Sequence, residues 1–129
     1  MDFNHTRLRM AAIFGLLAVA LGAFGAHGLK SHWESTLAAA EVAYRIDVWK
    51  TASHYHLAHA IVLLVLTFAF PGARQASASW WSFVAGISIF SGSLYALCLT
   101  GLKWLGAITP IGGVLLMLGW LLLAFQRRK

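Results

Sequence analysis

The chain has 129 residues, of which 60% are hydrophobic and 11% are charged, and its formal net charge is +6. A soluble domain usually carries roughly 25% charged residues, so this composition excludes an ordinary soluble globular protein. A basic balance can indicate nucleic-acid binding, but the basic residues here lie at the ends of apolar stretches, where anionic lipid headgroups explain them, and we expect no nucleic-acid partner.

Charged residues are absent from four windows of the chain, 10–29, 51–73, 75–102 and 104–126. Each window has at least 20 residues, and a helix of roughly 20 apolar residues crosses a hydrocarbon core of about 30 Å. We therefore predict an all-α protein with a single integral membrane domain over residues 1–129, in which the lipid bilayer is the first partner. Its four antiparallel transmembrane helices are expected at about 8–26, 52–70, 80–100 and 108–126.

The first predicted span follows two arginines and ends in the run from Gly25 to Gly28, where glycines are expected to release the helix. Residues 1–28 also imitate a secretory signal, with a basic, an apolar and a small-residue region in turn. We expect the segment to be retained as a span. Small residues at four-residue spacing let another helix approach closely, and they recur here at Ala18, Gly22 and Ala26.

Residues 29–50 form the one substantial polar connection. Apolar residues fall at helical spacing, while Glu41 and Arg45 pair on another face. This pattern predicts an amphipathic helix at the outer interface, either separate from the second span or continuous with it. Residues 42–48 also alternate like a strand, but the Ala38–Ala40 run and the lack of partner strands favour a helix. The apolar positions are Ala39, Val42, Ile46 and Trp49.

Two breaker signals are expected to end the second and third spans, Pro71-Gly72 and Gly101 respectively. In the third span the small residues Ser88, Gly92 and Ala96 predict a close helix contact. Gly92→Leu should then destabilise the protein more than Leu116→Ala, which is expected to leave a surface that lipid covers.

Thr109-Pro110 has the pattern of an N-cap followed by the first helical residue, and it is expected to start the fourth span. Cys98 is the single cysteine, so no disulfide can form within the chain.

The basic residues predict the orientation of the chain in the membrane. With four spans, six of them share the side of the termini and four lie opposite. By the positive-inside rule this imbalance places both termini in the cytoplasm. The first group is Arg7, Arg9, Arg74, Arg127, Arg128 and Lys129, and the second is Lys30, Arg45, Lys50 and Lys103.

Five of the six histidines lie between the end of the first span and the start of the second, at His27, His32, His54, His56 and His59. Antiparallel spans bring these ends together, so we expect His27 and His59 to approach within one side-chain layer of each other. Neutral imidazoles suit metal ions, and a titrating cluster relays protons. The candidate ligand-site or proton-site residues are His27, His56, His59, Tyr55, Tyr95 and Ser91.

A structural role for these side chains is nevertheless the favoured interpretation. Histidines near a helix end bond exposed carbonyls or headgroups, and hydroxyl groups on the third span serve contacts between helices. No HExxH, CxxC or CxxCH pattern is present, so no metal and no cofactor is expected. The spans contain no acidic residue and the chain has no Gly-x-Ser-x-Gly or phosphate-cradling loop, so we assign no catalytic residue and do not expect an enzyme.

Four ordered segments together resemble one family, the small membrane proteins of domain-of-unknown-function family 423, or the YgdD and transmembrane-protein-256 group. The resemblance covers essentially the whole chain and implies a four-span protein of the bacterial inner, or plasma, membrane, without implying an activity. His56 departs from the family pattern, where glutamine is expected; this weakens a metal site that requires both His56 and His59, and shifts attention to His27 and His59. The segments are Gly22-Ala23-Phe24-Gly25-Ala26-His27-Gly28-Leu29, Tyr55-His56-Leu57-Ala58-His59-Ala60, Phe90-Ser91-Gly92-Ser93-Leu94-Tyr95 and Leu105-Gly106-Ala107-Ile108-Thr109-Pro110-Ile111-Gly112-Gly113.

These observations favour a non-enzymatic, multi-pass membrane component that binds a lipid, a small molecule or a protein partner. The alternative is a small transporter or proton-linked carrier that uses His27, His56 and His59. A membrane enzyme or haem subunit is a third possibility. Proton uptake that depends on the histidines would favour the carrier, whereas a haem absorption band or stoichiometric metal would favour the third class.

Overall fold

A computed structural model describes residues 3–72, 74 and 76–127, and within these residues all regular structure is helical. In this part of the chain four helical stretches are long and apolar enough to cross a membrane, His5–Thr36, Ala39–Ala69, Ser77–Thr100 and Lys103–Ala124. The prediction of an all-α protein with four such helices is confirmed. The elements are α1 (His5–Phe24), the π-helical turn η1 (Gly25–Leu29), α2 (Lys30–Thr36), α3 (Ala39–Ala69), α4 (Ser77–Thr100), the 3-10 turn η2 (Lys103–Ala107) and α5 (Thr109–Ala124).

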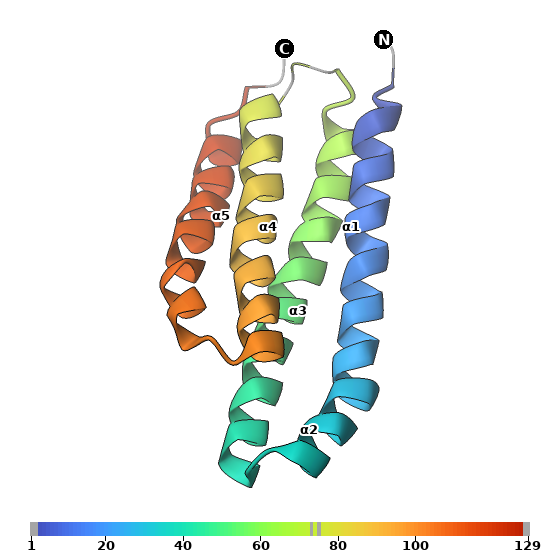
Figure 1. The fold of residues 1–129 in the computed structure, drawn as a ribbon. Helices are drawn as coiled ribbons and strands as arrows, with labels where there is room; N and C mark the ends of the chain where they lie inside the picture. The colour runs from blue at the N-terminus through green and yellow to red at the C-terminus, as the bar shows by residue number, and fades with distance from the viewer. Residues whose placement is uncertain (1–2, 73, 75, 128–129) are drawn as a thin grey trace.

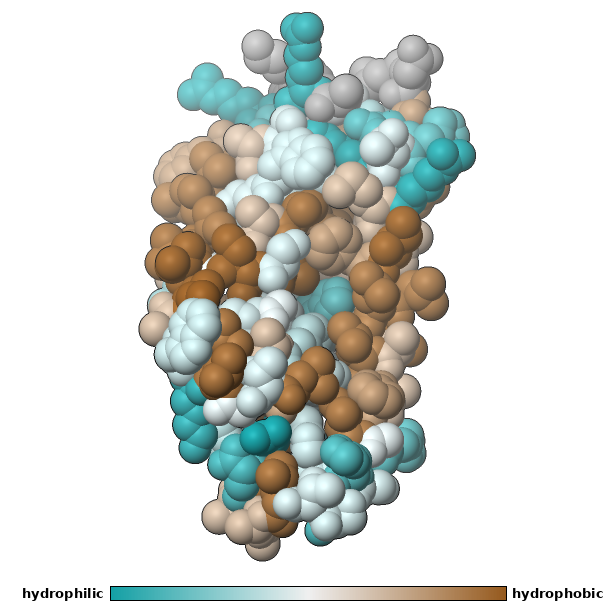
Figure 2. Space-filling view, in the orientation of Figure 1, coloured by the Kyte–Doolittle hydropathy of each residue, from teal (hydrophilic) through white to brown (hydrophobic). Residues whose placement is uncertain are grey.

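The four long helices pack in chain order, α1 on α3, α3 on α4 and α4 on α5 (Figure 1). The start of α1 and the end of α5 lie at one end of the molecule, while α2 and η2 lie towards the other. In the apolar segment of α4 half of the residues are buried, whereas in the apolar segment of the stretch His5–Thr36 only 17% are buried. Helix α4 is therefore central in the bundle, and α1 lies at its edge. Figure 2 shows apolar residues around the middle and hydrophilic residues at both ends, the distribution that a bilayer favours.

The first helix does not end at the glycines near His27, contrary to the sequence-based prediction. It continues from α1 through η1 into α2 and ends at Thr36. Gly25 acts as a close-contact position instead of a terminator, since a Cβ atom there would collide with the indole of Trp49 on α3. The helix accommodates this contact with a π turn, a form that is rare and is often found at functional sites.

The amphipathic helix expected between the first two spans is not a separate element. Residues 30–36 complete the first helical stretch, Leu37 and Ala38 are extended, and residues 39–50 are the first turns of α3. That helix runs unbroken to Ala69 because the stretch contains no glycine or proline. It ends immediately before Pro71-Gly72, as predicted.

The close helix contact predicted for the Ser88, Gly92, Ala96 stripe does not form. Ser88 and Gly92 are exposed, and a Cβ atom at Gly92 would meet nothing within 4 Å. The expectation for Leu116 was also wrong, because this residue is 4% exposed and packs against Gly86. The stripe was assigned to the wrong helix face, since small residues alone do not show which face meets a neighbour.

The tight contact lies between α4 and α5, where glycines of α5 meet α4. A Cβ atom at Gly112 would collide with the backbone of Phe90, and one at Gly119 would lie 2.8 Å from the ring of Phe83. Hydroxyl groups of α4 also donate to α5 carbonyls, from Ser79 to Gly119 at 2.8 Å and from Ser82 to Leu115 at 2.7 Å. These bonds are the interhelical role expected of serine in a membrane protein.

Polar contacts also determine how α4 ends and how α5 begins. Gly101 ends α4 with a φ of +74°, as predicted, and Arg45 Nη1 donates to the nearby Cys98 carbonyl at 2.8 Å. Thr109 is the first residue of α5, not its N-cap. Its hydroxyl lies 2.7 Å from that of Ser93 on α4, so it contacts the neighbouring helix and caps no amide of its own.

Gly112→Ala should lower the stability of the detergent-solubilised protein by about 1–3 kcal/mol, because the new methyl group must displace the backbone at Phe90. Gly92→Ala is the matched control, since a methyl group at that position meets no atom within 4 Å. Alanine is also the better helix former, so the control should be at least as stable as the parent protein. Thermal unfolding followed by circular dichroism measures both effects. An unchanged unfolding temperature for Gly112→Ala would contradict a close α4–α5 contact.

Candidate functional site

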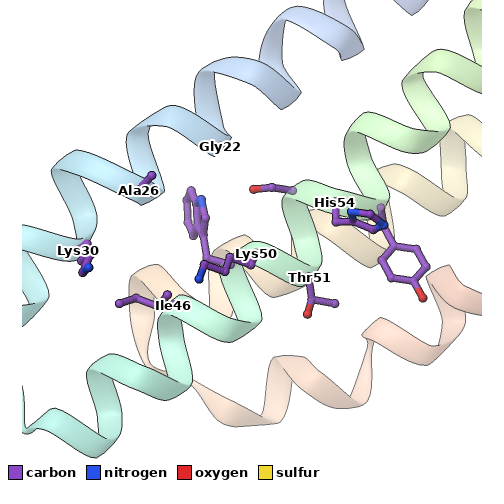
Figure 3. A pocket seen from close by; sticks show the side chains of 11 residues that line it. Gly22, Ala26, Lys30, Ile46, Lys50, Thr51 and His54 are labelled. Carbon is purple, nitrogen blue, oxygen red and sulfur yellow. The ribbon is translucent and has the colours of Figure 1, made fainter.

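A cavity of about 710 Å³ lies between the first helical stretch and α3 (Figure 3). This volume falls within the range of about 300–1,000 Å³ that is usual for small-molecule pockets. The cavity is therefore the candidate functional site. One wall consists of Gly22, Gly25, Ala26 and Lys30, and the other consists of Ile46, Trp49, Lys50, Thr51, Ser53, His54 and Tyr55.

Trp49 holds the two walls of the cavity in place. Its indole Nε1 donates a 2.8 Å hydrogen bond to the carbonyl of Leu21 on α1, and its ring lies 4.6 Å from that of Tyr95 on α4. Beside this contact, Gly22 has no side chain, and a Cβ atom there would meet nothing within 4 Å. The open space is thus bounded by a buried tryptophan and by a helix surface with small residues at Gly22, Gly25 and Ala26.

The cavity carries positive charge at one end and is otherwise apolar, aromatic or uncharged. Lys30 from α2 and Lys50 from α3 line it from opposite walls, and no carboxylate is among its lining residues (Figure 3). Lys30 lies 4.0 Å from Glu34, but both side chains are more than half exposed, so this pair contributes little. Within the described part of the chain, Lys50 makes no ion pair. The cavity therefore has an unneutralised cationic end.

A short chain of polar groups lies behind the cavity. Ser53 is among the lining residues, but its Oγ is buried and interacts with the hydroxyl of Tyr95. Farther inside, His56 Nδ1 lies 3.1 Å from the same hydroxyl. The buried imidazole of His56 also interacts with the backbone of Phe14, whose ring lies at a centroid distance of 6.0 Å. Two of the predicted site residues, His56 and Tyr95, are thus brought together.

His59 occupies a different environment, between α3 and α5. Its Nδ1 lies 2.8 Å from the backbone carbonyl of Tyr55, and its Nε2 accepts a 3.2 Å hydrogen bond from the indole N–H of Trp120. A carbonyl can only accept, so the first contact places a proton on Nδ1, and the second requires Nε2 to be unprotonated. Both bonds therefore fit the neutral imidazole, and His59 serves as a structural bridge between helices.

The predicted approach of His27 and His59 is not what the structure shows. Trp49 lies at the level of Gly25, and His59 is ten residues farther along α3, which is about 15 Å of helix. His27 lies beyond Gly25 in the opposite direction and is exposed. The prediction ended the first span at about residue 26, whereas the helix continues through η1 to Thr36 and carries His27 away from His59.

The other two predicted residues have separate positions. Ser91 Oγ is buried and donates a 2.8 Å hydrogen bond to the carbonyl of Ala52, which joins α4 to α3. Tyr55 lines the cavity and its ring stacks on that of His59, with centroids 6.1 Å apart. Within the described residues, no three His, Cys, Asp or Glu side chains are placed to hold a metal ion.

Sequence reasoning named Tyr55 as a site residue and His54 as a member of the histidine group, but it missed most of the residues that build the cavity. Trp49 was recognised only as part of an apolar stripe, and Gly22 as a position for close helix packing. Lys30 and Lys50 were not identified as site residues. The sequence does show small residues before Gly28, and a tryptophan followed by a lysine just before the second span. It does not show that these two segments face each other with space between them.

The chain is similar to proteins whose function is unknown. A model of the family DUF423, described as a protein of unknown function, matches residues 21–113. The UPF0382 membrane protein YwdK of Bacillus subtilis is 41% identical over 123 residues, which cover 93% of this chain and 94% of that protein. A UPF0382 membrane protein of Staphylococcus saprophyticus is 42% identical over 122 residues, with 93% and 94% covered. No solved structure matches significantly.

A double-mutant cycle on His59 and Trp120 tests the structural bridge. His59→Leu should lower stability by about 1–3 kcal/mol, because it removes the side-chain bond to the Tyr55 carbonyl, which keeps its helical partner, and leaves the Trp120 N–H without a partner. Trp120→Phe removes the indole N–H. The stability loss that it causes in the His59→Leu variant should therefore be smaller than the loss that it causes in the parent protein, by about 1 kcal/mol. Unfolding of the four proteins in one detergent measures the cycle. Strictly additive losses would contradict the bond.

Proposed function

The chain belongs to the family of proteins of unknown function DUF423, and from this premise we propose that it is a multi-pass membrane protein that binds an amphiphilic ligand between α1 and α3. The observation that supports the proposal is the cavity itself, which has a glycine-lined and aromatic interior and two lysines at one end. Such a combination suits a molecule with an apolar part and a polar part.

The lengths and charges of the helices support a position for the bilayer. α3 has 31 residues, which is about 46 Å of helix, compared with about 30 Å for the hydrocarbon core. All four charged side chains of α3 lie between Glu41 and Lys50. We therefore place residues 39–50 at the interface, as its amphipathic segment, and the following turns within the membrane. The four helices then cross in alternating directions.

The cavity lies across this border. Lys50 is the last charged residue of α3, while Tyr55 lies five residues deeper, about 7.5 Å along the helix. Gly22 belongs to the uncharged part of α1. A ligand in the cavity would therefore reach from the headgroup region into the hydrocarbon, which favours an amphiphile from the membrane over a soluble metabolite.

We propose binding without catalysis. The cavity lining contains no carboxylate and no thiol. The hydroxyl groups of Thr51 and Ser53 are not bonded to a base that would activate a nucleophile: Thr51 Oγ1 donates to the carbonyl of Asp47 at 3.1 Å, and the buried Ser53 Oγ interacts with the hydroxyl of Tyr95. A non-enzymatic role thus fits the groups that line the cavity.

A proton-linked carrier is the second candidate, and a single feature favours it. His56 is 5% exposed, its Nδ1 contacts the Tyr95 hydroxyl, and the backbone of Phe14 interacts with its imidazole. A buried imidazole can exchange a proton with a neighbouring group. The original form of this hypothesis, with His27 and His59 as further members, has no support from their positions. Proton uptake abolished by His56→Gln would favour the carrier.

Both termini are expected in the cytoplasm of a plasma-membrane protein, because six of ten basic residues lie on their side of the spans. Two members of this group, Arg128 and Lys129, lie outside the described residues, as does Ala73 in the connection between α3 and α4. Topology reporters fused after Lys129 and inserted between residues 76 and 77 should both report cytoplasm. A signal from the opposite side at either position would reverse the assignment.

Gly22→Leu should remove the bound amphiphile without unfolding the protein, because the new side chain enters the cavity and meets no existing atom within 4 Å at its Cβ. Gly15→Leu is the matched control on the same helix. A Cβ atom at Gly15 also meets nothing within 4 Å, but the position does not line the cavity. Native mass spectrometry of each protein, extracted from its own membrane, should detect the ligand with the parent and Gly15→Leu only. Equal retention by Gly22→Leu would refute the proposal.

A further inference from the structure

We propose that the ligand of this cavity is an anionic phospholipid whose phosphate group lies between Lys30 and Lys50. This inference rests on the proposed function, because it requires that an amphiphile occupies the cavity, and it adds the chemical class of the headgroup. The argument starts from charge. Two ammonium groups from separate helices line one cavity, and no carboxylate lines it with them.

The charges around the two lysines support an anion and not a cation. Glu34 approaches Lys30 at 4.0 Å but does not line the cavity. Asp47 lies three residues before Lys50, is exposed, and makes no ion pair in the described part of the chain. Two like charges that face one cavity repel each other, and a phosphate between them converts this repulsion into two attractions.

The rest of the lining supports a lipid as the source of the phosphate. The wall of α1 is glycine and alanine, the opposite wall includes Trp49 and Ile46, and Tyr55 lies at the deeper end. Outside the cavity, Phe24 near its Trp49 level is 51% exposed and Leu57 beyond its deeper end is 41% exposed, so both helices present apolar surface. A free phosphate would leave these walls uncovered, whereas acyl chains would cover them.

Lipid titrations of the purified protein test the headgroup assignment. Dioleoyl phosphatidylglycerol should bind more tightly than dioleoyl phosphatidylcholine, which has the same chains but no net charge. Lys30→Gln and Lys50→Gln should each weaken phosphatidylglycerol binding about fivefold, and they should weaken phosphatidylcholine binding less, because the choline group partly neutralises the phosphate of that lipid. Lys103→Gln is the control, since Lys103 is exposed, pairs with Glu41 and does not line the cavity. Inorganic phosphate should not displace the lipid.

The possible outcomes separate this inference from the proposed function. If both lipids bind equally and the lysine variants have no effect, while Gly22→Leu abolishes binding, the anionic headgroup is wrong and the amphiphile site stands. If inorganic phosphate competes with phosphatidylglycerol, the site is one for soluble phosphate and the lipid assignment fails. If Gly22→Leu retains both lipids with unchanged affinity, the cavity is not the binding site and both proposals fall.

Discussion

The indole ring of Trp49 occupies the space between the first two spans, at the level where α1 becomes η1. It is 3% exposed, its N–H is bonded to the Leu21 carbonyl, and its ring contacts both Trp33 and Tyr95. A buried indole N–H is usually hydrogen-bonded, and for Trp49 the acceptor is the backbone of a neighbouring helix. This one contact couples the spacing of α1 and α3, the irregular turn in the first helix and the presence of the cavity. Gly25 is its counterpart, since any larger residue would expel the ring.

The two sides of the molecule are held together by different means. Between α4 and α5, glycines permit close approach, and serine hydroxyls bond carbonyls across the contact. Between α3 and α4, Arg45 binds the Cys98 carbonyl near the end of α4, and Ser91 binds the Ala52 carbonyl. Within lipid, where apolar burial drives helix association only weakly, such polar and close-packed contacts determine which helices pair. The α1–α3 side combines the Gly25–Trp49 contact and the hydrogen bond from Trp49 to Leu21 with the cavity, so the space for a ligand lies beside a close contact.

The number and approximate position of the spans could be predicted because absence of charge is a local property that each segment displays by itself. The ends of α3 and α4 could also be predicted, because Pro71 and Gly101 terminate helices by their own geometry. The role of Gly25 could not be predicted. In the sequence, a glycine that ends a helix cannot be distinguished from one that packs under a tryptophan, and the partner Trp49 lies 24 residues later. The pairing of His59 with Trp120, 61 residues apart, is likewise a product of the assembled helices. A cavity is harder still, since no residue encodes the space that others leave open.

The π turn also changes the register of the first helical stretch. Before it, the buried positions Ala11, Ala18 and Gly25 recur every seven residues, a spacing that would next select His32. That residue is exposed, and Trp33 is buried in its place, so the inward face has moved by one position. A π turn has this effect because it holds one more residue than the α-helical turn it replaces. The first span and its extension thus behave as two helical segments joined by a single-residue insertion, which brings Trp33 against the ring of Trp49.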